Sequence, residues 1–468
     1  MKKHVFLLVF ALLAYIDAGA ELKYIFYFIG DGMGANQVLA TEMYLAETEG
    51  QIGRRRLCMT QFPVSGNLAT FSASNGITDS SAAGTCLATG HKSTNGFLGL
   101  DSKKDTVLSI ASQLKERGWG VGITTSVSID HATPAAFYAH VDKRNNYYTI
   151  GTQLARSGFD FFAGGTFYTP NPKEGNGDNL YDLCERNGYT IAHGYYDAMT
   201  KMAGKDKLIM IQDDEGIDRN KAGKGMIPYS IDRRGNELTL KQITQTAITF
   251  LSSRHDRFFL MVEGGSIDWA CHSNDAATAI REVIEMDEAL KEAVAFYKEH
   301  PDETLIVVTA DHETGGFALG RKGYNLNLKA LQHQHQSLAV LSERLKGMHK
   351  ELGRQLTWER VKSLLSDELG LYKEVEVTSE EDRRLHNAYK QMAKHKDKDV
   401  ETLYSSLNRL SEMAVSLLNE KALIGWTTTA HSASAVPVFA IGAGAERFTG
   451  WHDNSEVEQM MLKLTEER

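Results

Sequence analysis

Short apolar runs alternate along this chain with longer segments of helical periodicity, and this alternation restricts its fold more than any other feature. In residues 276–297, for example, apolar side chains such as Ile280, Val283 and Leu290 recur on one face of a helix. Strands that alternate with helices pair in parallel and are covered on both sides. We therefore predict an α/β fold with a central, mostly parallel sheet flanked by helices on both faces. Its expected strands are residues 24–29, 120–125, 207–211, 258–262, 305–309 and 436–442.

Residues 325–421 interrupt the alternation. This stretch is rich in Lys, Glu, Gln and Arg, contains no proline and lacks strong strand signals, whereas 341–345 and 407–418 have amphipathic helical patterns. We predict a helical insertion on the α/β core that serves as a lid or a dimer contact. Its His333 and His335 could bind a metal, but the polar surroundings favour a solvated surface.

The N-terminus has the order of a secretory signal peptide. Lys2 and Lys3 precede an apolar run at 5–13, and Ala18-Gly19-Ala20 forms a small-x-small cleavage site. The run is too short to span a bilayer, and no other stretch is apolar enough to do so. We predict that residues 1–20 are removed and that the remaining protein is periplasmic or secreted, without a membrane anchor.

Charge and cysteine content narrow the classes of function. The net charge of −9 argues against nucleic-acid binding, which needs a basic face. A phosphate-binding enzyme can still be acidic if metals and a few arginines supply local positive charge. The chain has four cysteines, Cys58, Cys86, Cys184 and Cys271, and an oxidising compartment would permit disulfides between them. The sequence does not decide which cysteines pair, or whether they remain free thiols.

Residues with oxygen and nitrogen donors follow several expected strands. Glu263, Asp268 and His272 come after the run at 258–262, at the edge where α/β proteins place ligands. Asp31 lies among three glycines after the first run, and the adjacent pair Asp311-His312 follows the run at 305–309. Such carboxylates and imidazoles suit divalent metals. The alternative is an ordinary charged surface loop or a capped helix.

Hydroxyls precede a helix of small residues at 77–86. A helix N-terminus there offers N–H groups to an anion, although Thr, Asp and Ser are also common N-caps. A nucleophilic serine needs activation, and a bound metal is the natural substitute because no single His is obviously spaced to serve as its base. Arg144, downstream, would clasp two phosphate oxygens if it points into the site and would otherwise be a solvated charge.

Taken together, these segments closely resemble the alkaline phosphatase family. The resemblance runs from residue 24 to about residue 461, apart from the insertion, and implies an alkaline phosphatase-like catalytic domain over 21–468. Its specificity comes from six blocks in the family's order, at residues 30–34, 78–90, 131–144, 263–272, 311–312 and 429–432.

The resemblance implies two zinc ions and one magnesium ion around a serine that is phosphorylated during turnover. One zinc ion is expected on Asp268, His272 and His431, and the other on Asp31, Asp311 and His312. Magnesium is expected on Asp31, Thr133 and Glu263. Imidazoles would thus serve zinc, and the set containing only oxygen ligands would serve magnesium.

The implied reaction is hydrolysis of phosphate monoesters of broad specificity, with Arg144 holding the phosphate. The family's Asp-Ser pattern selects Ser80 as the nucleophile, whereas Ser81 stands where a small residue is usual. His131 stands where other branches of the family have Asp, and Trp269 stands where Lys or His is usual. Both positions lie near the expected magnesium and phosphate, so the metal that the third site prefers stays open. A thiolate role for Cys271 is disfavoured because the family's ligand set contains no cysteine there.

Two other functions remain as alternatives. A phosphodiesterase of the same superfamily would commonly have a Thr nucleophile and lack the Arg144 block. An exported phosphate- or metal-binding protein without turnover would be expected to lack a nucleophile at the helix start. Small phosphate monoesters are the expected partners, and a homodimer is an open possibility.

Overall fold

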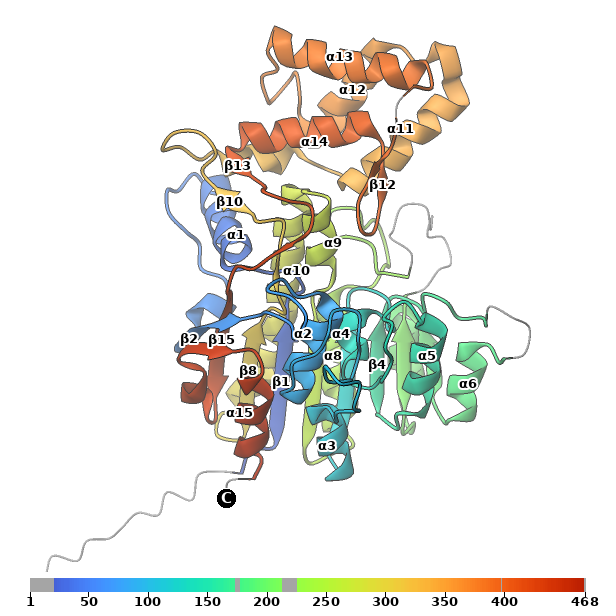
Figure 1. Cartoon of the computed structure of the whole chain (residues 1–468), viewed down its shortest axis with the longest axis vertical. Helices are drawn as coiled ribbons and strands as arrows, with labels where there is room; N and C mark the ends of the chain where they lie inside the picture. Colours follow the sequence, from blue (N-terminus) through green and yellow to red (C-terminus); the bar gives the residue numbers. More distant parts are fainter. Residues whose placement is uncertain (1–20, 173–176, 213–224, 397, 467–468) are drawn as a thin grey trace, which may run out of the picture.

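The computed structural model describes residues 21–172, 177–212, 225–396 and 398–466. The predicted signal peptide at 1–20 lies outside the described residues. One sheet organises the chain (Figure 1). Its strands, from one edge to the other, are β16 (Gly450–Asp453), β2 (Val64–Ala69), β15 (Val436–Gly442), β8 (Thr304–Thr309), β1 (Tyr24–Ile29), β7 (Phe258–Glu263), β3 (Gly120–Thr125), β4 (Phe161–Gly164), β6 (Leu208–Ile211) and β5 (Thr190–His193).

The sheet is mostly parallel, as predicted. From β8 through β1, β7, β3, β4 and β6 to β5, every neighbouring pair is parallel. In the described part of the sheet, only β15 runs against its neighbours, β8 and β2. The expected strands at 24–29, 120–125 and 436–442 have the predicted bounds, whereas the four-residue strands β4 and β5 had not been predicted.

Helices cover both faces of the sheet. A Cβ on Gly122 of β3 would meet Leu251, which lies at the end of α8, so this face is covered by α8. The preceding residue on β3, Val121, pairs with Phe259, whose ring lies 6.1 Å from that of Phe137 just after α4 on the opposite face. The helices of this part are α1 (Ala35–Thr48), α2 (Ser80–Thr89), α3 (Ile110–Glu116), α4 (Ala132–Ala135), α5 (Tyr147–Arg156), α6 (Leu180–Arg186), α7 (Gly194–Lys201), α8 (Leu240–Ser252), α9 (Ser266–His272), α10 (Ala276–Glu299) and α15 (Glu456–Leu464).

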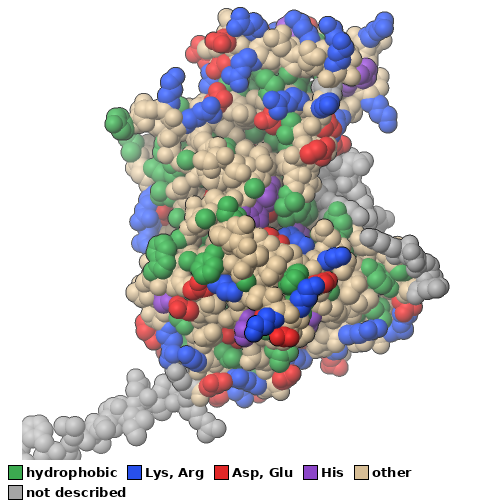
Figure 2. All heavy atoms as spheres, viewed as in Figure 1, with side chains coloured by type: hydrophobic (Ala, Val, Ile, Leu, Met, Phe, Trp, Pro, Cys, Tyr) green, Lys and Arg blue, Asp and Glu red, His purple; other side chains and the backbone are tan. Residues whose placement is uncertain are grey.

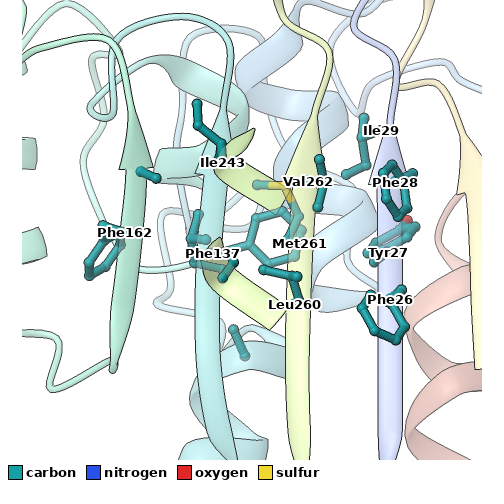
Figure 3. Packing of buried hydrophobic residues seen from close by; sticks show 14 of the residues in the cluster. Phe26, Tyr27, Phe28, Ile29, Phe137, Phe162, Ile243, Leu260, Met261 and Val262 are labelled. Atoms are coloured by element: carbon teal, nitrogen blue, oxygen red, sulfur yellow. The ribbon is translucent and has the colours of Figure 1, made fainter. Parts of the chain in front are cut away.

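The central strands are apolar along almost their whole length because both of their faces are covered. Every residue of β7 and β8 is buried, and Phe26, Tyr27 and Phe28 of β1 have no exposed surface. Figure 3 shows these side chains packed with Phe137 and Met261. The rigid core therefore holds the carboxyl ends of these strands in fixed positions.

The predicted insertion is helical and has its own apolar cluster. It contains α11 (Leu338–Leu352), α12 (Trp358–Leu369), α13 (Ser379–Ala393) and α14 (Arg409–Lys421). Leu341, Leu365 and Leu418 are fully buried and join Tyr44 of α1 and Ile280 of α10 in one cluster. The helices thus stack over α1 and the start of α10 (Figure 1). A short hairpin of β11 (Val400–Glu401) and β12 (Ser406–Leu407), which the sequence did not predict, precedes α14.

The remaining short elements are β9 (Glu313–Thr314) with β14 (His431–Ser432), β10 (Ala318–Leu319) with β13 (Ile424–Gly425), and the 3₁₀ turns η1 (Met59–Gln61), η2 (Leu328–His333), η3 (Gly353–Gln355) and η4 (Ala445–Phe448). All four cysteines lie in the described residues and are free thiols. Among the described residues, no helix has the length and apolar character needed to cross a membrane. Acidic and basic side chains are interspersed over the face in Figure 2.

Candidate metal centre and active site

The four central strands of the sheet end at the same level and bring the candidate ligands together. Ile29 at the end of β1 pairs with Glu263 of β7 and with Thr309 of β8, and Glu263 also pairs with Thr125 of β3. The chain segments that follow these strands carry Asp31, the pair at 311–312, and the residues of α9. The predicted ligands therefore meet because the parallel register aligns the strand ends.

The first group of ligating side chains is Asp268, His272 and His431. Asp268 and His272 are four residues apart on α9, on one side of the helix, and their Oδ2 and Nε2 atoms lie 3.3 Å apart. His431 comes from β14, which pairs with β9 directly after the 311–312 segment. All three residues are buried, so the surface-loop alternative for 263–272 is wrong.

The two imidazoles of this group are oriented by main-chain carbonyls. His272 Nδ1 lies 2.6 Å from the carbonyl oxygen of Thr429, and His431 Nδ1 lies 2.8 Å from that of Thr78. A proton on each Nδ1 leaves both Nε2 lone pairs free, and these Nε2 atoms are 3.2 Å apart. Two nitrogens bound to one tetrahedral zinc at about 2.0–2.1 Å would lie roughly 3.3 Å apart. The pair therefore fits a shared zinc ion.

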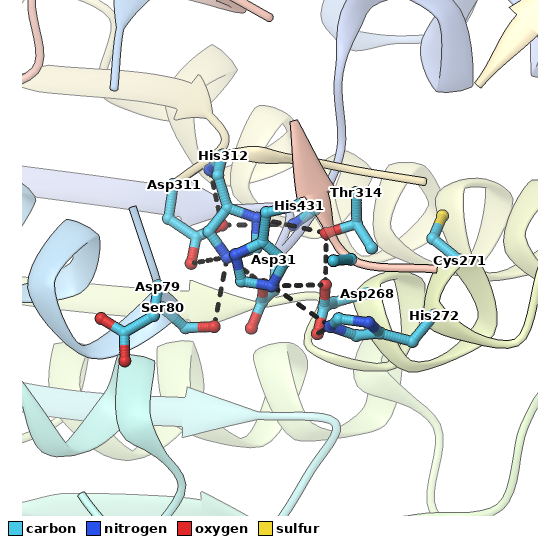
Figure 4. Close-up of polar contacts among 12 residues, drawn as sticks. Asp31, Asp79, Ser80, Asp268, Cys271, His272, Asp311, His312, Thr314 and His431 are labelled. Atoms are coloured by element: carbon cyan, nitrogen blue, oxygen red, sulfur yellow. Dashed lines mark hydrogen bonds and ion pairs between the residues drawn. The ribbon is translucent and has the colours of Figure 1, made fainter. Parts of the chain in front are cut away.

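The second group consists of Asp31, Asp311 and His312 (Figure 4). His312 Nε2 lies 3.3 Å from Asp31 Oδ1 and 3.3 Å from Asp311 Oδ2. The hydroxyl of Thr314 lies 3.2 Å from His312 Nδ1 and donates to Asp268 Oδ1, so it connects the two groups. None of these three ligating side chains is exposed, which contradicts the alternative that His312 lies on the surface.

A third group contains Asp31, Glu263 and His131. Thr133 Oγ1 is near it, 3.4 Å from Asp31 Oδ2. Glu263 accepts a short hydrogen bond from the Thr125 hydroxyl. The oxygen donors expected for magnesium are thus together, and an imidazole lies among them.

The buried carboxylates of the three groups favour the binding of cations. Burial raises the pKa of Asp31 and Asp311 well above the usual range, and the neighbouring carboxylates raise both further. Burial likewise raises the pKa of Glu263 to about 7. Burial opposes ionisation of Asp268 too, but His272 and His431 hold its pKa below the usual range. Among the described residues, Asp31 Oδ1, Asp268 Oδ2 and Glu263 Oε1 are buried without a hydrogen-bond partner. Divalent cations would satisfy these atoms and offset the repulsion.

Ser80 is the first residue of α2 and faces the second group. Its Oγ lies 3.1 Å from His312 Nε2 (Figure 4). Ser81 Oγ points elsewhere, donating to Asp79 Oδ2 at 2.6 Å and accepting from the Gly96 N–H at 3.0 Å. Asp79 itself caps α2 by accepting from the Ala82 N–H at 2.9 Å. The N-cap alternative therefore holds for Asp79, while Ser80 is free to face the ligating groups.

Arg144 also points into the site. Its guanidinium donates to Asp79 Oδ2 at 3.3 Å and to His131 Nε2 at 3.4 Å. The ring of Trp269 is buried and lies edge-on to that of His131, with centroids 5.7 Å apart. Arg144, His131 and Trp269 thus line the side of the site next to Asp79.

Comparison with known proteins agrees with this geometry. The family model described as alkaline phosphatase matches residues 22–159 and 222–466. The chain belongs to the alkaline phosphatase family. It is an enzyme, a phosphoric monoester hydrolase. Alkaline phosphatase 4 of Bacillus subtilis is 30% identical over 455 residues, which cover 95% of this chain and 89% of that protein.

Solved alkaline phosphatases share the fold. The cold-active enzyme from Shewanella sp. is 28% identical, with a TM-score of 0.77 over 94% of this chain and 99% of that chain. A histidine-to-aspartate variant of TAB5 alkaline phosphatase, with Mg bound in its M3 site, is 26% identical, with a TM-score of 0.65 over 96% of this chain and 99% of that chain.

Other candidates of the sequence do not join the alkaline phosphatase site. Among the described residues, neither His333 nor His335 belongs to a group of three ligating side chains. His333 is half-buried and His335 is exposed, as a solvated surface predicts. Burial raises the pKa of the Cys271 thiol well above its usual range, which disfavours a thiolate.

Two residues of the site escaped the sequence reasoning. Thr314, which connects the first two groups, is marked only by its place two residues after His312. Tyr404, from the turn of the β11–β12 hairpin, reaches Arg144 across 260 residues of sequence, and nothing in its local sequence signals this.

Proposed function

We propose that this enzyme hydrolyses phosphate monoesters of broad specificity through a phosphoserine at Ser80, with two zinc ions and one magnesium ion. The placement of Ser80 Oγ, 3.1 Å from His312 Nε2 at the rim of two carboxylate–imidazole groups, supports this proposal most directly. Metal ions held by these groups would supply the activation that the Ser80 hydroxyl requires, with His312 serving as a ligand and not as a free base.

The donor sets indicate which residues would hold each ion. Asp268, His272 and His431 suit one zinc, and Asp31, Asp311 and His312 suit the other. Asp31, Glu263 and Thr133 offer the oxygens that magnesium prefers, with His131 close by. When bound, these ions lower the pKa of the serine hydroxyl, stabilise developing charge on oxygen and activate water.

The chain's own residues then account for a two-step reaction. Ser80 Oγ gives its proton to solvent and forms a bond to phosphorus as the bond to the ester oxygen breaks, and the leaving oxygen takes a proton from water and departs as the alcohol. Asp79 and His131 hold the Arg144 guanidinium in place. Its planar fork can then bind two non-bridging oxygens of the phosphoryl group. Water then attacks the phosphoserine, which releases inorganic phosphate and restores the Ser80 hydroxyl. None of these groups recognises the alcohol, so broad specificity follows.

Hydrolysis of p-nitrophenyl phosphate at alkaline pH, with and without a chelator, tests this function. We expect chelator-sensitive turnover, restored by zinc and magnesium together, and much slower turnover of bis-p-nitrophenyl phosphate. Preference for the diester would favour the phosphodiesterase alternative. Phosphate or metal binding without turnover of either ester would favour the non-catalytic alternative.

We further propose that the enzyme is exported and acts on small phosphate monoesters outside the cytoplasm. The signal-peptide pattern at 1–20 supports this. N-terminal sequencing of the mature protein should then begin at Glu21, and an intact N-terminus on the exported enzyme would contradict the cleavage site. Light scattering in solution distinguishes a monomer from the homodimer that the sequence leaves open.

A further inference from the structure

The helical insertion contributes one side chain to the active site. Tyr404 lies in the turn between β11 and β12, and its ring is stacked on that of Trp269 with centroids 4.4 Å apart and planes 13° apart. The same ring lies edge-on to His131 at 5.7 Å and to His272 at 5.3 Å. An aromatic residue of the insertion therefore packs directly against two side chains of the candidate metal groups.

The hydroxyl of Tyr404 reaches Arg144. The guanidinium NH2 group donates to Tyr404 Oη at 3.3 Å, in addition to its contact with His131 and the contact of NH1 with Asp79. Burial raises the pKa of Tyr404 well above its usual range, so the hydroxyl stays neutral. Arg144 is thus oriented by three groups from three different parts of the chain.

One of these groups connects Arg144 to the nucleophile. Asp79 caps the helix that begins with Ser80, so the contact from Arg144 fixes the guanidinium relative to the helix start. An arginine side chain loses considerable rotamer freedom when it is held in one orientation. Each contact that holds it beforehand reduces the entropy that phosphate binding must overcome.

The turn that carries Tyr404 is itself anchored. Within it, the N–H of Thr402 donates to the carbonyl of Ser405 at 2.8 Å. Lys346 of α11 donates to the Ser406 carbonyl at 2.7 Å and pairs with Asp399 at 2.8 Å. The hairpin is therefore fastened to the insertion helices at its base and to the active site at its tip.

We propose that Tyr404 is a positioning residue, through which the insertion holds Arg144 ready for the phosphoryl group. This inference rests on the proposed function, because it assigns Arg144 to phosphate. The hydroxyl acts through Arg144, while the ring, stacked on Trp269, holds the hydroxyl in place. The insertion would then tune phosphate affinity through this one side chain.

Calorimetric titration of zinc- and magnesium-loaded protein with inorganic phosphate tests the proposal. Tyr404→Phe keeps the stacked ring and removes only the hydroxyl, and we expect it to weaken phosphate binding roughly 10- to 150-fold, the range for loss of one hydrogen bond to a charged group. Tyr404→Leu should weaken binding at least as much. With p-nitrophenyl phosphate, Tyr404→Phe should raise KM while kcat is retained. Tyr324→Phe, which alters a fully exposed tyrosine just before the insertion, should change nothing.

A double-mutant cycle separates positioning from a general structural role. In an Arg144→Ala background, Tyr404→Phe should have no further effect on phosphate affinity. An equal loss in both backgrounds, or an affinity of Tyr404→Phe within twofold of the unaltered enzyme, would overturn the role of Tyr404 while leaving the proposed function intact. If the unaltered, metal-loaded protein neither binds phosphate nor hydrolyses the ester, the proposed function fails and this inference fails with it.

Discussion

The Nε2 atoms of His272 and His431 face each other at 3.2 Å, although 159 residues separate them in the sequence. The Nδ1 atom of His272 lies against the carbonyl oxygen of Thr429, and that of His431 against the carbonyl oxygen of Thr78. Two lone pairs so close repel unless a cation lies between them, and Asp268 adds a carboxylate beside them. The backbone thus holds two imidazoles in an arrangement that a metal ion stabilises.

Removal of the metals should destabilise the fold. Without cations, buried carboxylates of the three groups repel one another, and the binding energy of the ions is lost. We expect a chelator to lower the melting temperature by roughly 5–15 °C. Differential scanning calorimetry checks this, and re-addition of zinc should restore the transition. A melting temperature unaffected by the chelator, with metal loss verified, would contradict the assignment.

Replacing His131 by Asp should change the preference of the third group. The substitution makes this set purely oxygen, which favours magnesium over zinc. We expect His131→Asp to bind Mg²⁺ at least several-fold more tightly and to depend on it more strongly for turnover, as judged by metal titration of the zinc-loaded enzyme. Unchanged magnesium affinity would argue that His131 lies outside the third site.

The stability of the protein should depend on the ionisation of Glu282, which lies on α10 away from the metal groups. Its Oε1 accepts from the Ser230 N–H at 2.7 Å and from the hydroxyl of the same residue at 2.8 Å. Burial raises its pKa from 4.5 to about 7, Glu285 raises it further and Arg233 opposes the shift. The folded state therefore keeps a proton that the unfolded chain releases, and the stability contribution falls as pH rises from about 4.5 to 7.

Glu282→Gln retains both hydrogen bonds and cannot ionise. Its free energy of unfolding relative to the unaltered protein should rise with pH across this range, by at most about 1.4 kcal/mol per pH unit. Urea unfolding at pH 5.5 and pH 7.5 measures the difference, with the exposed Glu359→Gln as a control. A difference that stays constant between the two pH values would show that Glu282 is ionised in the folded state.

Much of this structure could be predicted because its signals are local. Buried parallel strands are nearly continuous apolar runs, and β1 and β3 have the expected bounds for this reason. The ligating residues directly follow such strands or belong to family blocks, so Asp31, Asp311 and His312 could be named before their contacts were known. The register of the sheet then brings these residues together.

The remaining features depend on contacts between distant segments. β2 contains Gly66, where a Cβ would come within 2.5 Å of the Phe448 carbonyl oxygen. The residue at this position is therefore determined by a distant segment of the chain and not by the alternation of apolar and polar residues. β4 and β5 have only four residues each, too few for a reliable period. Tyr404 lies in a polar turn, and only the packing of the insertion places it against Trp269.

The central claim is that Ser80 carries the phosphoryl group. Acid quenching during turnover of a ³²P-labelled monoester, followed by peptide mapping, measures this directly. We predict label on Ser80, loss of label and of turnover in Ser80→Ala by at least about 10³-fold, and retention of both in Ser81→Ala. Label that persists in Ser80→Ala, or that is lost in Ser81→Ala with its metals still bound, would contradict the account.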